Sequence, residues 1–344
     1  MGKRIIICSD GTWNRPETKG EEIYPTNVIK FARGIAPKGL DGKKQIVFYD
    51  WGIGSYHDKL GGGMFAKGLE KNVMDAYRFI VHNYEAGDEL FFFGFSRGAY
   101  TVRSLSGLLN NCHVLKSTKG QLIEKAFKLY KDPSKKANGP DSKQWREENS
   151  LPNSGIVHFI GVWDTVGSVG VPFSIFGFIE DKHVFYDNKL GSNVKVARHA
   201  LSLDEERNDF EPTIWQPRSG VNIKQVWFAG VHSDVGGGYE KDVNGVLLSD
   251  IPMNWMMKEA KRFKMKFDDT IDLGALHPLA EKHNEYKRLY YLRGKHKRTI
   301  PKKDEVPTLV HYSVKERYEQ SAYRSFGIEK YVSDFGEWPD IETD

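Results

Sequence analysis

The sequence is poor in cysteine, and this excludes two classes of protein. It contains only Cys8 and Cys112 among its 344 residues. Two cysteines cannot form the dense disulfide framework of a small secreted domain, and their spacing is not that of a zinc or iron–sulfur site. We therefore expect a protein of a reducing compartment. We also expect neither a metal nor a cofactor.

Long hydrophobic runs are also missing. No stretch approaches the ~20 apolar residues of a membrane-spanning helix. The apolar run at 5–8 follows two basic residues, but it is too short for the hydrophobic region of a signal peptide, and no cleavage site follows it. We expect synthesis in the cytoplasm, so that export would need a system that reads no cleaved signal.

The net charge is small as well. A formal net charge of +4 does not indicate nucleic acid as a partner, and no nucleic-acid-binding motif is present. One basic run stands out at 293–303; its members are Arg293, Lys295, Lys297, Arg298, Lys302 and Lys303. We expect this run to form a solvated loop, with a transient contact to anionic lipid head groups as the alternative.

Apolar runs alternate with segments of helical character along the chain. Strands are expected at 4–8, 45–49, 90–93, 156–163 and 224–230, where the runs fit strands buried on both faces. Helices are expected at 26–34, 70–84, 99–109, 122–130, 193–203 and 251–263. This alternation predicts an α/β protein with a mainly parallel central sheet and helices on both faces.

The most informative segment is Gly94-Phe95-Ser96-Arg97-Gly98, which lies between an expected strand and an expected helix. This is the G-x-S-x-G elbow in the strand–turn–helix context that it requires. Ser96 must occupy a strained turn to expose its hydroxyl, and side chains at Gly94 and Gly98 would clash with neighbouring elements. The alternative is an ordinary turn whose glycines serve packing alone.

An oxyanion hole is expected beside this serine. The amide of Arg97, at the start of the helix, would supply the first donor. The loop that follows the first strand would supply the second, from Gly11 or Thr12. An equally weighted alternative is a turn in which the Asp10 side chain accepts backbone amides; Asp10 is also a candidate for contact with substrate or for support of the site.

A serine nucleophile needs a base that is held by an acid. In α/β-hydrolases the order along the chain is serine, acid, histidine, each at the carboxyl end of a strand. Asp164 and His232 fit this order, with 68 residues separating Ser96 from Asp164 and 68 separating Asp164 from His232. They are predicted to meet Ser96 at one edge of the sheet.

Some alternatives stay open. His311 comes late in the chain and competes with His232 as the base. Asp234 competes as the acid, although it is better explained as shaping its own loop or the pocket. The apolar loop at 171–179, with Phe173 and Phe176, either lines an acyl-binding site or packs beneath an insertion.

Four motifs in this order resemble one known family, the α/β-hydrolase domain of type VI secretion phospholipase effectors, the first of the lipase effector families. They are Cys8-Ser9-Asp10-Gly11-Thr12-Trp13-Asn14, Gly94-Phe95-Ser96-Arg97-Gly98-Ala99-Tyr100, Gly161-Val162-Trp163-Asp164-Thr165-Val166-Gly167 and 227–238. The resemblance implies a triad of Ser96, Asp164 and His232 and the hydrolysis of phospholipid acyl esters. Secreted members often carry additional membrane-binding modules, for which 344 residues leave little room.

We therefore expect an α/β-hydrolase fold in a single domain over 1–344. Insertions are expected at about 113–150 and 171–190, with a mainly helical part from about 250. The expected activity is that of a serine hydrolase on lipid carboxylic esters. A soluble carboxylesterase or thioesterase is the alternative, and a non-catalytic binding scaffold is a third. An immunity or carrier protein as a partner is left open.

Overall fold

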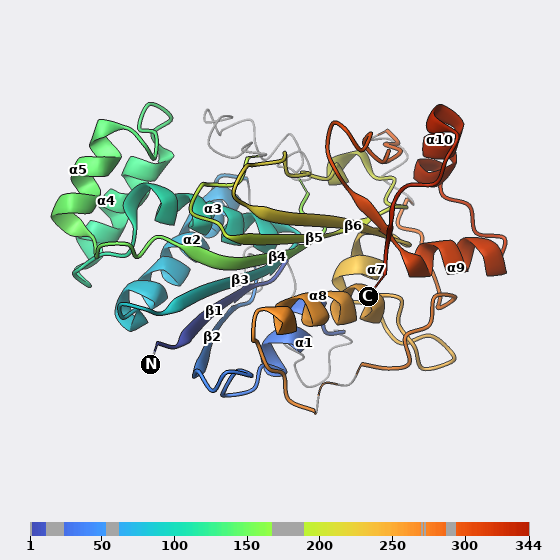
Figure 1. Cartoon of the computed structure of the whole chain (residues 1–344), viewed down its shortest axis with the longest axis horizontal. Coiled ribbons are helices and arrows are strands. Elements are labelled where there is room, and N and C mark those ends of the chain that lie inside the picture. The colour runs from blue at the N-terminus through green and yellow to red at the C-terminus, as the bar shows by residue number, and fades with distance from the viewer. Residues whose placement is uncertain are drawn as a thin grey trace.

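The computed structural model describes residues 2–11, 24–52, 62–166, 189–269, 271, 273–286 and 294–343, with the backbone alone described at 62–67. Its centre is an eight-stranded sheet with the order β2-β1-β3-β4-β5-β6-β7-β8, in which all neighbours are parallel (Figure 1). The strands are β1 (Arg4–Ser9), β2 (Gln45–Asp50), β3 (Glu89–Phe95), β4 (Val157–Trp163), β5 (Val196–Ser202), β6 (Asn222–Phe228), β7 (Leu309–His311) and β8 (Ile341–Glu342).

The central strands are buried on both faces, which explains their continuous apolar runs. In β1, Ile5 and Ile7 join one hydrophobic cluster, whereas Ile6 and Cys8 join another on the opposite face. A third cluster lies around β6, β7 and the C-terminal helices. Because successive side chains point to opposite faces, a single strand of this kind supplies two cores.

Helices cover both faces of the sheet (Figure 1). Residues of α2 (Gly62–Asn83), α3 (Arg97–Cys112) and α4 (Gly120–Lys131) form one core with the sheet, and α1 (Asn27–Arg33) and α8 (Asp250–Arg262) form the other. The remaining helices are α5 (Pro140–Asn149), α7 (His232–Gly236), α9 (Tyr312–Gln320) and α10 (Phe326–Phe335), with a short 3-10 helix η2 (Asn208–Phe210). None of the helices in the described residues combines the length and the apolar composition that crossing a membrane requires.

This arrangement confirms the predicted fold class, an α/β-hydrolase fold with a parallel sheet between two helical layers. The five expected strands are present as β1, β2, β3, β4 and β6. The helix expected at 122–130 is present as α4, and α5 follows it within the segment expected as an insertion.

The helix expected at 193–203 is wrong, because this segment contains β5. All seven residues of β5 are buried, and the strand pairs with β4 on one side and β6 on the other. Burial between two neighbouring strands overrides the helical preference of alanine and leucine in this segment. As a result, β4 and β6 are not adjacent, and any pair of side chains from their carboxyl ends must reach across β5.

The C-terminal part, which we expect from the sequence to be mainly helical, contains two strands in addition to its helices. Besides α8, α9 and α10, this part contains β7 and β8, which extend the sheet beyond β6. These strands have three and two residues, which is too short for a recognisable period of apolar residues.

Candidate active site

The elbow lies where β3 ends and α3 begins. Ser96 has φ 56° and ψ −119°, a conformation that is strained for a residue with a side chain. A β-carbon on Gly94 would lie 2.5 Å from Gly98 O, and one on Gly98 would lie 2.0 Å from Ser9 O. Both glycines are therefore required by the close approach of α3 to β3 and β1.

Asp164 and His232 form a buried pair. Asp164 Oδ2 lies 2.6 Å from His232 Nδ1, and the two residues are 0% and 4% exposed. Asp164 follows β4 with a positive φ of 39°, and His232 is the first residue of α7 after β6. The pair reaches across β5, so the tertiary structure joins an acid and a base from strands that are not neighbours.

The environment keeps Asp164 ionised and His232 neutral. Burial favours the neutral form of Asp164, but the charge of Arg298 and the hydrogen bond from His232 outweigh this effect and lower the pKa of Asp164 below its ordinary value. Burial also lowers the pKa of His232, and this outweighs the opposing effect of its hydrogen bond to Asp164. A neutral imidazole beside an ionised carboxylate is the state in which histidine accepts a proton.

Aromatic rings hold the imidazole of His232 next to the elbow. The ring of Phe95 lies 4.5 Å from it, centroid to centroid, and Phe210 lies edge-on to it at 4.9 Å. Because Phe95 directly precedes Ser96, His232 and Ser96 belong to the same small region. In the described part of the chain, no hydrogen bond joins Ser96 to His232; such contacts often form only with bound substrate.

Arg298 is a third buried charge at this site. Its two terminal nitrogens donate to the two carboxylate oxygens of Asp164 at 2.6 and 3.0 Å, and the residue is 2% exposed. The prediction of a solvated loop is therefore wrong for Arg298. The sequence carries no signal that distinguishes Arg298 from the other basic residues of this run.

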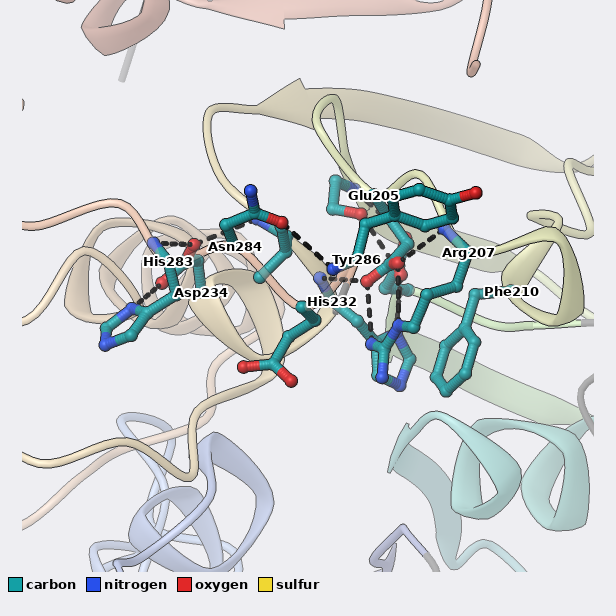
Figure 2. Close-up of polar contacts among 12 residues, drawn as sticks. Glu205, Arg207, Phe210, His232, Asp234, His283, Asn284 and Tyr286 are labelled. Carbon is teal, nitrogen blue, oxygen red and sulfur yellow. Dashed lines mark hydrogen bonds and ion pairs between the residues drawn. The ribbon is translucent and has the colours of Figure 1, made fainter. Parts of the chain in front are cut away.

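Glu205 and Arg207 support the backbone of His232 (Figure 2). Glu205 Oε2 accepts a hydrogen bond from the His232 amide at 3.2 Å. The Glu205 carboxylate also accepts the Arg207 Nε and Nη2 groups at 2.8 and 2.7 Å, and the guanidinium lies 3.6 Å above the ring of Phe210. The sequence analysis missed Glu205, which sits in a polar loop without a motif.

Asp234 points away from His232 and pairs with His283 (Figure 2). Its Oδ1 lies 2.7 Å from His283 Nδ1, and its Oδ2 accepts the amides of Val231 and His283 at 2.9 and 3.1 Å. The hydrogen bond to Asp234 raises the pKa of His283 despite the opposing effect of burial. Asp234 thus shapes the loops around α7, the second of the two roles considered for it.

His311 lies at the end of β7 and caps α9. Its Nδ1 lies 2.8 Å from the Ser313 hydroxyl and accepts the Ser313 amide at 3.3 Å, and its ring stacks on Phe228 at 4.7 Å. A side chain so engaged favours His232 over His311 as the base.

The loop after β1 adopts the turn that was weighed as an alternative. Asp10 Oδ1 accepts the Gly11 amide at 2.7 Å, and Asp10 Oδ2 accepts the hydroxyls of Thr26 and Tyr49 at 2.5 and 2.8 Å. Arg97 is the first residue of α3, where helix amides lack partners within the helix. Thr12, Phe173 and Phe176 lie outside the described residues.

Within the described ranges, no group of three or more histidine, cysteine, aspartate or glutamate side chains is placed to hold a metal ion.

Comparison with family models matches residues 3–259 to the catalytic domain of Tle1-like phospholipase effectors of the type VI secretion system. An uncharacterised protein of Saccharomyces cerevisiae is 28% identical over 239 residues, which cover 63% of this chain and 33% of that protein.

Solved structures align less closely. An uncharacterised protein from Pseudomonas aeruginosa aligns with a TM-score of 0.46 and 18% identity, covering 77% of this chain and 46% of that one. The Tle1 effector bound to the VgrG spike of the type 6 secretion system aligns with a TM-score of 0.42 and 20% identity, covering 70% of this chain and 52% of that one. The chain thus spans about a third of the yeast relative and about half of each solved chain.

The family match confirms the resemblance seen in the four sequence motifs, and it contains the elbow, Asp164 and His232. Because residues 3–259 make up most of the chain, the chain belongs to the family of Tle1-like catalytic domains of type VI secretion phospholipase effectors.

Proposed function

We propose that this domain is a serine hydrolase that cleaves the acyl esters of phospholipids through a triad of Ser96, Asp164 and His232. The observation that carries the proposal is the buried 2.6 Å contact between Asp164 and His232, which lies against the residue that precedes the elbow serine. The choice of phospholipid rests on the family to which the chain belongs.

In the first step, His232 Nε2 takes the proton of the Ser96 hydroxyl as its oxygen attacks the ester carbonyl carbon. Asp164 accepts the Nδ1–H of His232, which fixes the tautomer with a free Nε2 and stabilises the imidazolium that forms. The carbonyl oxygen acquires the negative charge. The Arg97 amide and the positive end of α3 stabilise this charge, and one such donor contributes ~3 kcal/mol in related sites.

The second oxyanion donor comes from the loop after β1. Since the Gly11 amide donates to Asp10, this bond favours Thr12 of the two candidates.

His232 then gives its proton to the leaving alcohol oxygen as the carbon–oxygen bond breaks, which leaves an acyl group on Ser96. A water molecule attacks this acyl-enzyme with His232 again as the base, releasing the fatty acid and restoring the serine.

The test is fatty-acid release from mixed phospholipid vesicles by the wild type and by Ser96→Ala, His232→Ala and His311→Ala. We expect release by the wild type and by His311→Ala, and none by the other two variants. Labelling of Ser96 by a fluorophosphonate probe checks the nucleophile independently of the substrate. An active Ser96→Ala variant, or an unlabelled wild type that is folded, contradicts the proposal.

A soluble esterase is the alternative, and a series of p-nitrophenyl esters of increasing chain length separates the two. A phospholipase increases its rate once the longer esters form micelles, whereas a soluble esterase prefers short monomeric esters.

Since the family takes its name from type VI secretion, we also propose export by that system without a cleaved signal. Detection of the protein in the medium of secretion-competent cells, but not of secretion-deficient cells, tests export.

A further inference from the structure

We infer that Arg298 is a positioning residue of the proposed triad. It fixes the carboxylate of Asp164, the acid, relative to the segments that surround His232, the base. The inference rests on the proposed function, because it assigns Arg298 a role through Asp164 and His232. Arg298 lies beyond residues 3–259, the part of the chain that matches the family model. The C-terminal part would therefore complete a catalytic site whose three reacting groups lie within that match.

The contact between Arg298 and Asp164 is bidentate. The two terminal nitrogens each meet one carboxylate oxygen, at 2.6 and 3.0 Å, which is the paired arrangement that a guanidinium allows and an ammonium does not. Asp164 is fully buried and Arg298 nearly so. In such a place the carboxylate can stay ionised only if a positive charge compensates it.

The same guanidinium also fixes two backbone segments around the base. Nη1 donates to the carbonyl and the hydroxyl of Ser202 at 2.8 and 2.6 Å, and Nη2 donates to Phe210 O at 2.6 Å. Ser202 in turn donates its amide to Asp164 Oδ1 at 3.0 Å, and the ring of Phe210 packs against His232. The Arg298 side chain thus contacts both Asp164 and Phe210, the residue whose ring packs against His232.

Neighbouring residues of Arg298 hold the loop that supports His232. The His296 amide donates to Glu206 O at 2.9 Å, and Lys295 Nζ lies 2.8 Å from Glu206 Oε2. Glu206 stands between Glu205 and Arg207, the pair that holds the His232 amide in Figure 2. Residues 295–298 therefore contact both the Asp164 carboxylate and the loop that holds the His232 amide.

The charge of Arg298 has a consequence for the base. Among the residues that the structure describes, Arg298, Arg207, Glu205 and His199 are the charged and titratable groups that face the pair. Without Arg298, the ionised Asp164 would be compensated by His232 alone, so the imidazolium would be more stable and His232 would accept its proton at a higher pH. A role in folding stability alone would not move the titration of His232.

The experiment compares wild type, Arg298→Gln and Arg298→Lys in short-ester hydrolysis and in fluorophosphonate labelling of Ser96 across pH. We expect Arg298→Gln to lower kcat/KM by roughly 100-fold at neutral pH, which is less than the ~10⁴-fold that loss of a triad acid costs. We expect the acidic limb of the pH profile of kcat/KM to move to higher pH by about one unit in this variant. Arg298→Lys keeps the charge but not the paired contact, so its acidic limb should stay nearer the wild-type position.

Arg198→Gln is the matched control. Arg198 is 3% exposed and its Nε donates to Glu259 at 2.5 Å, so this variant also breaks a buried ion pair, but on β5 and away from Asp164. It should lower Tm without moving the pH profile. If Arg298→Gln lowers Tm and leaves the pH profile of the residual activity unchanged, Arg298 is merely structural and the inference is wrong. If the wild type itself is not labelled, the proposed function fails instead.

Discussion

Gly98 in α3 and Ser9 at the end of β1 approach each other backbone against backbone. A β-carbon added at Gly98 would lie 2.0 Å from the Ser9 carbonyl oxygen and 2.4 Å from its carbon. This contact, rather than the positive φ of a turn, is what requires glycine there, because no positive φ occurs at Gly98. It lets the start of α3 lie directly against the strand that leads to Asp10 and Gly11.

We predict that Gly98→Ala destabilises the fold by ~1–3 kcal/mol, the usual cost of forcing a methyl group into a packed interior, and weakens Ser96 labelling as α3 shifts. Thermal unfolding and the rate of fluorophosphonate labelling measure the two effects. Gly120→Ala is the control, since a β-carbon at this first residue of α4 has open space around it. Equal Tm values for the two variants would show that the contact with Ser9 does not constrain the elbow.

We predict that Asp164→Asn lowers kcat by ~10⁴-fold, because an amide neither fixes the tautomer of His232 nor stabilises its charge. It should also destabilise the fold by ~3–5 kcal/mol, since it leaves Arg298 as an unpaired buried charge. Ester hydrolysis and chemical denaturation measure these changes. Asp234→Asn is the control: it weakens the pair with His283 and should keep most of the activity, and a loss equal to that of Asp164→Asn would point to Asp234 as the acid.

We predict that His311→Ala loses stability and keeps activity. The variant removes the cap of α9, which is worth ~1 kcal/mol, and the stacking on Phe228. Its Tm should therefore fall, while kcat/KM at a temperature well below Tm stays within about twofold of the wild type, since His311 has no part in proton transfer in the proposed mechanism. A stable His311→Ala protein without activity would instead favour His311 as the base.

We predict that the pair of Asp234 and His283 stabilises the fold at low pH. The hydrogen bond to Asp234 raises the pKa of His283 above its ordinary value of 6.5. The stabilisation is thus complete below pH 6.5 and is lost as the pH rises through the raised value. Denaturation of wild type and His283→Gln at about pH 5.5 and about pH 8.5 should show a larger difference at the lower pH. His82→Gln, at an exposed position of α2, is the control, and a pH-independent difference for His283→Gln would contradict the prediction.

The sequence by itself determined the features that depend on neighbours along the chain. The apolar run before Ser96, the glycines on either side and the helical segment after it make the elbow recognisable, because a tight turn needs small residues at fixed offsets. The runs that end at Asp164 and near His232 likewise mark strand ends. These residues are predicted to meet Ser96 because parallel strands bring their carboxyl ends to one edge of the sheet.

Only the tertiary structure decided the rest. β5 is a strand because β4 and β6 bury it on both edges, and β7 is recognisable by its pairing with β6 and β8. Arg298 is a buried partner of Asp164 although 134 residues separate them. Burial and charge compensation depend on segments that are distant in the chain, and local composition does not encode which of several basic residues will be enclosed.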